Sequence, residues 1–199
     1  MKILFINNRD SFVWNLVDYF SMFESDTEVV PNTITLEEVK SISPDVIVIS
    51  PGPGNPENRG DIGSCVDIIR EFGSEIPLLG ICLGNQSINT AFGGTTAYTE
   101  GGPVHGKGHQ IQHDESPIFD GISNPMTAGR YHSLGIETLS SELEIIATTH
   151  NGLIMGVKHR KYPVYGLQFH PESVLTPDGL KLIRNFLKIA EGFHNSCKH

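Results

Sequence analysis

Short runs of apolar residues alternate with amphipathic stretches through the first half of the chain. The apolar runs predict four buried strands, over Lys2–Asn7, Thr27–Val30, Asp45–Ser50 and Pro77–Ile81. The third run holds four consecutive β-branched residues, Val46 to Ile49, which is typical of a strand covered on both faces. Strands separated by helices at this spacing predict right-handed crossovers and a mostly parallel sheet.

The stretches between these strands have apolar residues at three- and four-residue intervals, which predicts helices. Thr35 and Glu38 have the spacing of a capping box, so a short helix is expected to begin there. Asp10 or Ser11 is expected to cap an earlier helix. That helix would bury Phe12, Leu16, Val17 and Phe20 on one face. Further helices are predicted over Ile62–Phe72, Gln86–Phe92 and Pro177–Ala190.

The second half of the chain is less regular. Residues 95–165 are predicted to form short strands and turns, because several glycines interrupt any helix. A last strand is expected over Tyr165–Gln168, and the segment from Glu191 onward is expected to fray. Together these patterns predict one α/β domain over residues 1–192, followed by a C-terminal tail over residues 193–199. Its core would be a mostly parallel open sheet with helices on both faces.

Charge and composition narrow the possible classes of protein. Hydrophobic residues make up 38% and charged residues 19%, as in ordinary soluble proteins. A net charge of −9 without any Lys/Arg-rich run argues against a nucleic-acid-binding surface, because phosphate backbones are held by Lys and Arg. No apolar segment approaches the roughly 20 residues that a membrane-spanning helix needs.

The first residues of the chain and the spacing of its cysteines predict the cellular compartment in which the protein acts. The opening apolar run ends at Asn7, which is too short for a signal peptide. Cys65, Cys82 and Cys197 are odd in number and widely spaced, so they favour a reducing compartment over a disulfide framework. We therefore expect a soluble cytoplasmic protein that binds neither membrane nor nucleic acid.

The pentapeptide Gly80-Ile81-Cys82-Leu83-Gly84 lies where a predicted strand turns into a helix. This is the spacing of a nucleophile elbow, with Cys in place of Ser. The flanking glycines let strand and helix approach closely around a strained turn. A thiol there faces the positive end of the helix, which favours the reactive thiolate. We therefore predict that Cys82 is a nucleophile, and that neither Cys65 nor Cys197 is.

A cysteine nucleophile needs a His to transfer protons and usually a third group to orient the imidazole. His170 follows a predicted strand, at the carboxyl end where open α/β sheets place their sites. Glu172 lies two residues on and is a candidate orienting group. His105, His109 and His113 would line one face of a helix and suggest a metal site, but the intervening glycines disfavour a helix, so no metal is expected.

Two loops are further candidates. Ser50-Pro51-Gly52-Pro53-Gly54 follows a predicted strand, and its prolines stiffen a turn whose glycines expose backbone N–H groups. Such a loop beside a nucleophile can complete an oxyanion hole, although alone it is equally consistent with an ordinary tight turn. Tyr131-His132-Ser133-Leu134 is a polar cluster that is consistent with a binding loop or with no function.

Taken together, these motifs resemble the class I, or triad, glutamine amidotransferases over nearly the whole chain. Each motif is weak alone, but the Gly–Pro loop, the Cys82 elbow and Phe169-His170-Pro171-Glu172 occur in the family's order and spacing. Within the class, further segments resemble the small subunits of anthranilate synthase and aminodeoxychorismate synthase. These segments are Asn8-Arg9-Asp10-Ser11-Phe12, His105-Gly106-Lys107 and Arg130-Tyr131-His132-Ser133-Leu134.

The resemblance implies a role for each matching residue. Cys82 would attack the side-chain amide of L-glutamine and form a γ-glutamyl thioester. His170 would act as base and then as acid, with Glu172 orienting its ring. Gly54 and Leu83 would supply the N–H groups of the oxyanion hole. Glutamine would be held by Gly52, Gly54, Gln86, Ser133 and Leu134.

The resemblance also implies a partner. In these synthases ammonia passes to a large subunit that aminates chorismate in a Mg²⁺-dependent reaction, so Mg²⁺ is expected in that partner and no cofactor in this chain. The first expectation is the glutaminase subunit that serves anthranilate and tryptophan synthesis. The alternatives are its counterpart in para-aminobenzoate and folate synthesis, or an inert subunit that stabilises a synthase. One position departs from the family's pattern, because Asn85 stands where His usually follows Cys-Leu-Gly.

Overall fold

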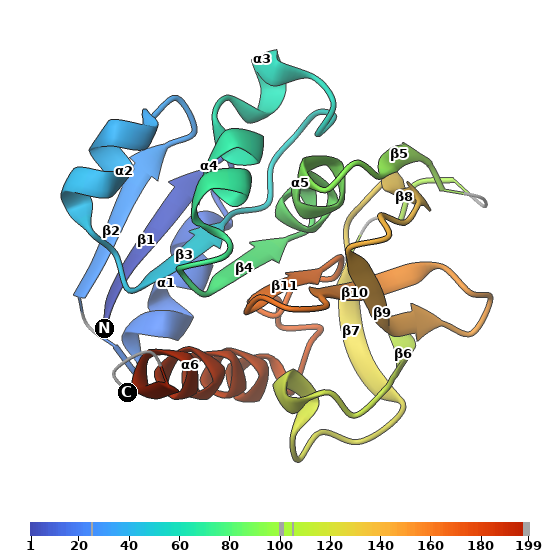
Figure 1. Ribbon diagram of the computed structural model, residues 1–199. Coiled ribbons are helices and arrows are strands. Elements are labelled where there is room, and N and C mark those ends of the chain that lie inside the picture. The colour runs from blue at the N-terminus through green and yellow to red at the C-terminus, as the bar shows by residue number, and fades with distance from the viewer. Residues whose placement is uncertain (25, 100–101, 105, 197–199) are drawn as a thin grey trace.

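A nine-stranded sheet crosses the part of the chain that the structure describes, in the order β2-β1-β3-β4-β11-β10-β9-β6-β7 (Figure 1). The structure is a computed structural model, and it describes residues 1–24, 26–99, 102–104 and 106–196. Five neighbouring strands are parallel, as the sequence predicts. They are β2 (Asp26–Pro31), β1 (Lys2–Asn7), β3 (Val46–Ile49), β4 (Leu78–Ile81) and β11 (Val164–Leu167).

Beyond β11 the pairing becomes antiparallel. This half contains β10 (Ile154–His159), β9 (Leu143–Thr149), β6 (Lys107–His113) and β7 (Met126–Arg130). A separate two-stranded ribbon pairs β5 (Thr95–Tyr98) with β8 (Leu134–Thr138), and a 3₁₀ turn, η1, covers Pro117–Phe119. The short strands predicted for residues 95–165 are therefore present, and four of them, β6, β7, β9 and β10, extend the parallel part of the sheet.

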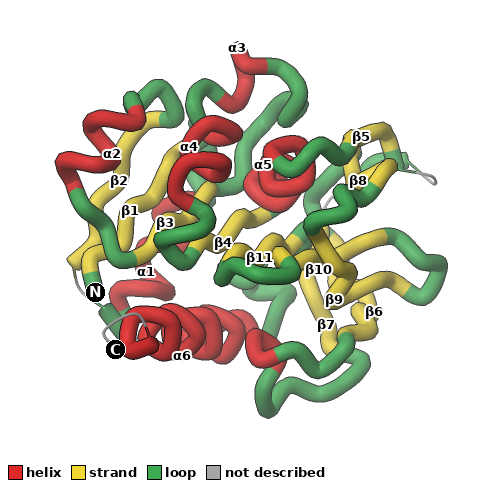
Figure 2. The backbone as a smooth tube through the Cα atoms, viewed as in Figure 1, coloured by secondary structure: helices red, strands yellow, loops and turns green. Residues whose placement is uncertain are grey.

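Helices cover both faces of the parallel strands, as predicted (Figure 2). On one face lie α1 (Val13–Ser21) and α6 (Gly179–Ser196), and on the other lie α2 (Leu36–Ile42), α4 (Cys65–Phe72) and α5 (Leu83–Ala91). Both faces of the sheet need a covering layer because successive side chains along a strand such as β1 point to opposite faces. Phe5 packs in the cluster that includes Leu16 of α1, whereas Ile6 packs in the cluster that includes Ile68 of α4.

The helix predicted over Ile62–Phe72 is two helices in the structure. α3 (Arg59–Ile62) ends before Gly63, whose φ of +53° belongs to the left-handed region that favours glycine. The N–H of Ser64 then donates to the backbone oxygen of Asn32 over 2.8 Å. The chain therefore breaks at Gly63 to dock against the loop after β2, which helical periodicity alone did not predict.

The prediction for the start of α1 was also wrong in detail. Phe12 occupies the N-cap position without any side-chain cap, and α1 begins at Val13. The Asp10 carboxylate instead accepts a hydrogen bond from the N–H of Phe12 over 2.8 Å, which makes a local turn. Phe12 is 37% exposed, so it does not belong to the buried face of the helix.

The C-terminal segment is more ordered than predicted, because α6 continues through Ser196. His194 contacts the backbone oxygen of Asp45 over 2.9 Å and so fixes the last turn to the start of β3. Cys197 lies outside the described residues. Among the residues that the structure describes, no helix is both long and apolar enough to cross a membrane.

Candidate active site

Cys82 lies at the junction of β4 and α5, where the chain makes a strained turn. Its φ of 53° and ψ of −102° are unusual for a residue with a side chain, and its N–H donates to the backbone oxygen of Leu167 over 2.8 Å. That bond ties the elbow to β11. As the first residue of α5, Leu83 has no intrahelical acceptor for its N–H, which leaves this donor at the positive helix end.

The glycines on either side of Cys82 are required by close packing. A Cβ at Gly80 would lie 2.5 Å from the backbone carbon and oxygen of Gly84, and a Cβ at Gly84 would collide with the backbone oxygen of Ile49. Strand and helix therefore approach as closely as the sequence predicts for a nucleophile elbow.

We expect Gly80→Ala to lower the free energy of unfolding by about 1–3 kcal/mol, because backbone atoms cannot move aside cheaply. Gly192→Ala is the matched control, since a Cβ there has no neighbour within 4 Å. Alanine in a helix should be neutral or stabilising by up to about 1 kcal/mol. Denaturant unfolding of both variants would test this, and equal stabilities would contradict the packing argument.

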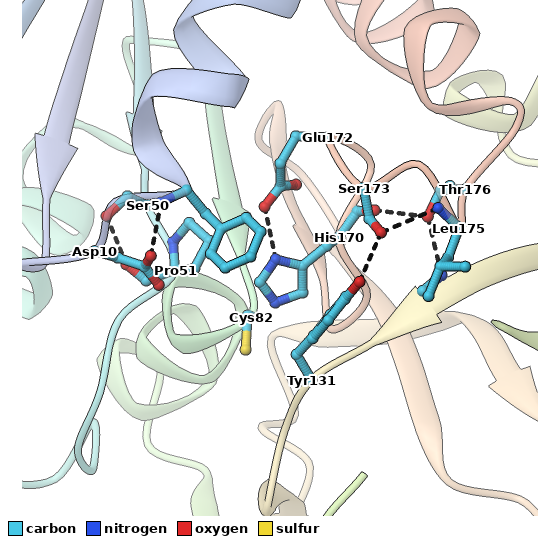
Figure 3. A network of polar contacts seen from close by, with 12 residues as sticks. Asp10, Ser50, Pro51, Cys82, Tyr131, His170, Glu172, Ser173, Leu175 and Thr176 are labelled. Carbon is cyan, nitrogen blue, oxygen red and sulfur yellow. Dashed lines mark hydrogen bonds and ion pairs between the residues drawn. The ribbon is translucent and has the colours of Figure 1, made fainter. Parts of the chain in front are cut away.

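His170 lies between Glu172 and Cys82 (Figure 3). Its Nδ1 is 2.6 Å from Oε1 of Glu172, and its Nε2 is buried without a hydrogen-bond partner in the described structure. Cys82, His170 and Glu172 are all buried, with exposed fractions of 7%, 3% and 3%. The structure therefore brings the predicted nucleophile, base and orienting group together at the carboxyl ends of β4 and β11.

The surroundings of His170 favour its charged form. Burial acts most strongly and alone would lower its pKa, but the neighbouring Cys82 sulfur and the Glu172 carboxylate together raise the pKa well above the ordinary value. A protonated imidazole beside a thiolate is the state in which a cysteine attacks and a His can deliver a proton.

Bonds to β7 hold the segment that carries His170. The N–H of His170 donates to the backbone oxygen of Gly129 over 3.0 Å. The Thr176 hydroxyl donates to the backbone oxygen of His170 over 2.6 Å and accepts the N–H of Gly129 over 2.9 Å. The rings of Tyr131 and Phe12 lie 5.0 and 5.8 Å from the imidazole centroid. The base is therefore fixed by backbone bonds and flanked by two aromatic rings whose place in the site the sequence patterns did not predict.

The Gly–Pro loop runs beside the elbow. Gly52 packs so closely that a Cβ there would lie 2.5 Å from the Asn8 side chain and 3.0 Å from that of Leu83. Asn8 anchors the start of the loop, because its N–H and side-chain amide donate to Ser50 over 2.8 and 3.0 Å. Gly54, at a φ of 103°, lies two residues farther along against the Asp61 carboxylate. The loop therefore lies against the elbow, and Gly52 is its glycine that contacts Leu83.

Besides the two glycines of the Gly–Pro loop, the predicted glutamine-binding residues are Gln86 on α5, Ser133 just before β8, and Leu134 at the start of β8. The Gln86 side-chain amide donates to the backbone oxygen of Leu134 over 2.9 Å, which joins the two. Ser133 is half-buried, and its backbone oxygen accepts the N–H of Thr99 over 2.9 Å. The structure thus joins Gln86 and Leu134 directly by a hydrogen bond.

Arg130 and His132 are buried in the same region, and the sequence patterns assigned neither a role. Arg130 Nε donates to His132 Nε2 over 3.1 Å, so the other ring nitrogen carries the proton and donates to the backbone oxygen of Leu134 over 2.9 Å. Burial first, and then the Arg130 charge, lower the pKa of His132 to about 4. His132 is therefore neutral near pH 7.

This depressed pKa makes a stability prediction. Between about pH 6.5 and 4 the unfolded chain binds a proton at His132 that the folded protein does not, so the folded state loses stability as pH falls. We expect the stability advantage of the wild type over His132→Gln to shrink by up to about 3 kcal/mol from pH 7 to 4. Urea unfolding of both proteins across this range measures it, and a constant difference would refute the assignment.

Asn85, which departs from the family's pattern, is fully buried on α5. Its side-chain amide donates to Oε1 of Gln168 over 3.4 Å, and a Cβ at Gly166 would collide with its Oδ1. Among the described residues that oxygen has no hydrogen-bond partner. Asn85 therefore fits because residue 166 is glycine, and it supplies a donor to Gln168.

The remaining candidates lie apart from this site. Burial raises the pKa of the Cys65 thiol to about 12, and the thiol donates to Oδ1 of Asn8 over 3.2 Å. His109 and His113 lie on strand β6, while His105 falls outside the described residues. Within the described ranges, no group of three or more His, Cys, Asp or Glu side chains is placed to hold a metal ion.

Comparison with known proteins places this geometry in a family. The family model described as glutamine amidotransferase class-I matches residues 4–190. Anthranilate synthase component 2 of Thermococcus kodakarensis is 47% identical, over 94% of this chain and 98% of that protein. Anthranilate synthase component 2 of Methanocaldococcus jannaschii is 48% identical, over 94% and 96%.

Two solved structures agree with the fold. A putative GMP synthase subunit from Thermoplasma acidophilum superposes with a TM-score of 0.90 at 27% identity, over 100% of this chain and 98% of that one. A glutamine amidotransferase of Thermotoga maritima superposes with a TM-score of 0.77 at 18% identity, over 96% and 98%. The second similarity, at this low identity, concerns the fold alone.

Proposed function

The chain belongs to the glutamine amidotransferase class-I family, and from this premise we propose that it is the glutaminase subunit of an anthranilate synthase. The proposal is carried by the buried Cys82–His170–Glu172 arrangement, found in a chain that is 47% and 48% identical to two proteins named anthranilate synthase component 2. The substrate of this subunit is L-glutamine, and its product ammonia serves a partner chain.

The first half of the reaction forms a thioester. The Cys82 thiolate attacks the side-chain amide carbon of glutamine, and the carbonyl electron pair moves onto the oxygen. The N–H of Leu83, free at the start of α5, stabilises this oxyanion together with the N–H of Gly54. When the C–N bond breaks, its electron pair stays on nitrogen, and Nε2 of His170 protonates the departing ammonia.

The second half releases glutamate. His170, now neutral, takes a proton from water, and the hydroxide attacks the γ-glutamyl thioester. Collapse of this intermediate expels the Cys82 thiolate, which restores the resting ion pair. Glu172 holds Nδ1 over 2.6 Å throughout, so Nε2 keeps facing the reacting atoms. Gly52, Gly54, Gln86, Ser133 and Leu134 hold the amino-acid end of glutamine.

The rest of the synthesis belongs to a partner. The proposed site contains a nucleophile and a proton donor that release ammonia, and the released ammonia needs an acceptor. We propose a large chorismate-using subunit that receives it and forms anthranilate, with the required Mg²⁺ bound by that subunit. The expected assembly is therefore a heteromer that acts in the cytoplasm.

The test mixes the chain with its cognate large subunit, chorismate, glutamine and Mg²⁺, and identifies the aromatic product by mass. Anthranilate formed with glutamine supports the proposal. Aminodeoxychorismate would keep the glutaminase mechanism and move the chain to folate synthesis. Product formed with ammonia but not with glutamine would mean that this chain is inert, and would overturn the proposal.

A further inference from the structure

Gln168 contacts the nucleophile from a direction that the triad does not use. It is the residue after β11 and is fully buried. Its Nε2 donates to the Cys82 sulfur over 3.6 Å, and its Oε1 accepts from Gln86 over 3.1 Å and from Asn85 over 3.4 Å. An amide whose oxygen receives two donors must turn its nitrogen the other way, which here is toward sulfur.

The orientation of this amide follows from backbone atoms. The Leu134 backbone oxygen can only accept, so the group of Gln86 that approaches it over 2.9 Å must be the NH₂. The same NH₂ is 3.1 Å from Oε1 of Gln168, and its two protons therefore point at two acceptors. The remaining end of the Gln168 amide, its NH₂, faces Cys82.

The chain of hydrogen bonds extends beyond Leu134 to a buried cation. Arg130 can only donate, so its bond to His132 makes Nε2 of that ring an acceptor and Nδ1 a donor to the Leu134 oxygen. The Leu134 oxygen thus accepts from His132 on one side and from Gln86 on the other, so this carbonyl, and not Arg130, sets the direction of the Gln86 amide. Arg130 is 4% exposed and His132 is 4% exposed, so water does not compete for these bonds.

We propose that Gln168 is a catalytic residue that donates its amide N–H to the Cys82 thiolate, in a direction that the Leu134 backbone oxygen fixes through Gln86. The inference rests on the proposed glutaminase function, because it assigns the thiolate a second donor besides His170. A donor aimed at an anion in a buried site stabilises it more than a neutral pair would. The charged and titratable groups around the sulfur and the hydrogen-bond chain are His170, Glu172, Arg130, His132 and His109.

The test of Gln168 uses two variants that both remove the donor to sulfur. Only one of them keeps the oxygen that accepts from Gln86 and Asn85. Gln168→Glu keeps an oxygen for Gln86 and Asn85 but replaces the donor to sulfur with a second oxygen. Gln168→Met keeps the length of the side chain and removes donor and acceptor together. Both are expected to slow alkylation of Cys82 by a chloroketone analogue of glutamine by about 10- to 100-fold near neutral pH. Both should also move the half-maximal rate to higher pH across about pH 6 to 9.

The outcomes separate the possible explanations. Alkylation of Gln168→Glu at the wild-type rate would mean that the residue serves only as an acceptor for packing, and would overturn the proposal. Gln112→Met on the exposed part of β6 is the matched control and should react as the wild type does. If the wild-type complex itself shows no selective reaction at Cys82, the proposed function fails and not the role of Gln168. Co-purification of each variant with the large subunit, at the wild-type ratio, reports that the variant is folded and assembled.

Discussion

Replacing Cys82 with alanine is expected to abolish glutamine-dependent synthesis by the complex and to leave ammonia-dependent synthesis unchanged. The thiol is the atom that forms the thioester, and loss of a nucleophile from a cooperating triad costs at least about 10⁴-fold in rate. Alanine fits the elbow, because it keeps the backbone and removes only the sulfur. The measurement is the rate of product formation by the reconstituted complex, with glutamine in one assay and with ammonium chloride in a parallel one.

Cys65→Ser is the matched control for this prediction. Cys65 is also buried, but its thiol is held protonated and bonded to Asn8, and a serine hydroxyl can make the same bond. Glutamine-dependent synthesis should therefore survive. If Cys82→Ala lost the ammonia-dependent reaction as well, in a complex that still assembles, the division of labour between the two chains would be wrong.

The parts of this protein that sequence reasoning recovers are those set by local chemistry. Strand β1 and the capping box at Thr35 were predicted correctly, because an apolar run and a Thr-to-Glu spacing act over a few residues. The elbow was predicted for the same reason, because the two glycines that allow its close packing, Gly80 and Gly84, stand in the same pentapeptide as Cys82. Local patterns also made His170 and Glu172 candidates, and the structure places both beside Cys82 shortly after the end of β11.

Other features depend on contacts between distant segments. The break at Gly63 is set by the backbone of Asn32, and the extension of α6 by the Asp45 carbonyl, neither of which is local. The hydrogen-bond chain to Cys82 joins Arg130 and Gln168 through α5, so it depends on β7, α5 and β11 meeting. No spacing rule within one segment could have oriented these side chains.

Glu172→Gln is expected to lower glutaminase turnover by about 10³-fold while changing the KM for glutamine little. The carboxylate accepts from Nδ1 of His170 over 2.6 Å and stabilises the imidazolium of the resting ion pair, so it acts on the reacting groups and not on the binding of glutamine. A neutral amide in its place can turn its NH₂ to the ring and force Nε2 to carry the only proton. The ring is then a poor base toward the thiol.

The measurement is steady-state glutamate release by the complex across a range of pH. Because Glu172 raises the pKa of His170, the variant should lose its imidazolium at lower pH than the wild type, and the alkaline limb of its rate profile should move to lower pH with it. Glu191→Gln, on the exposed side of α6, removes the same charge far from the ring and should leave rate and profile unchanged. A variant with wild-type turnover would mean that the backbone bonds from Gly129 and Thr176 alone orient the imidazole, and that the 2.6 Å contact contributes nothing to the reaction.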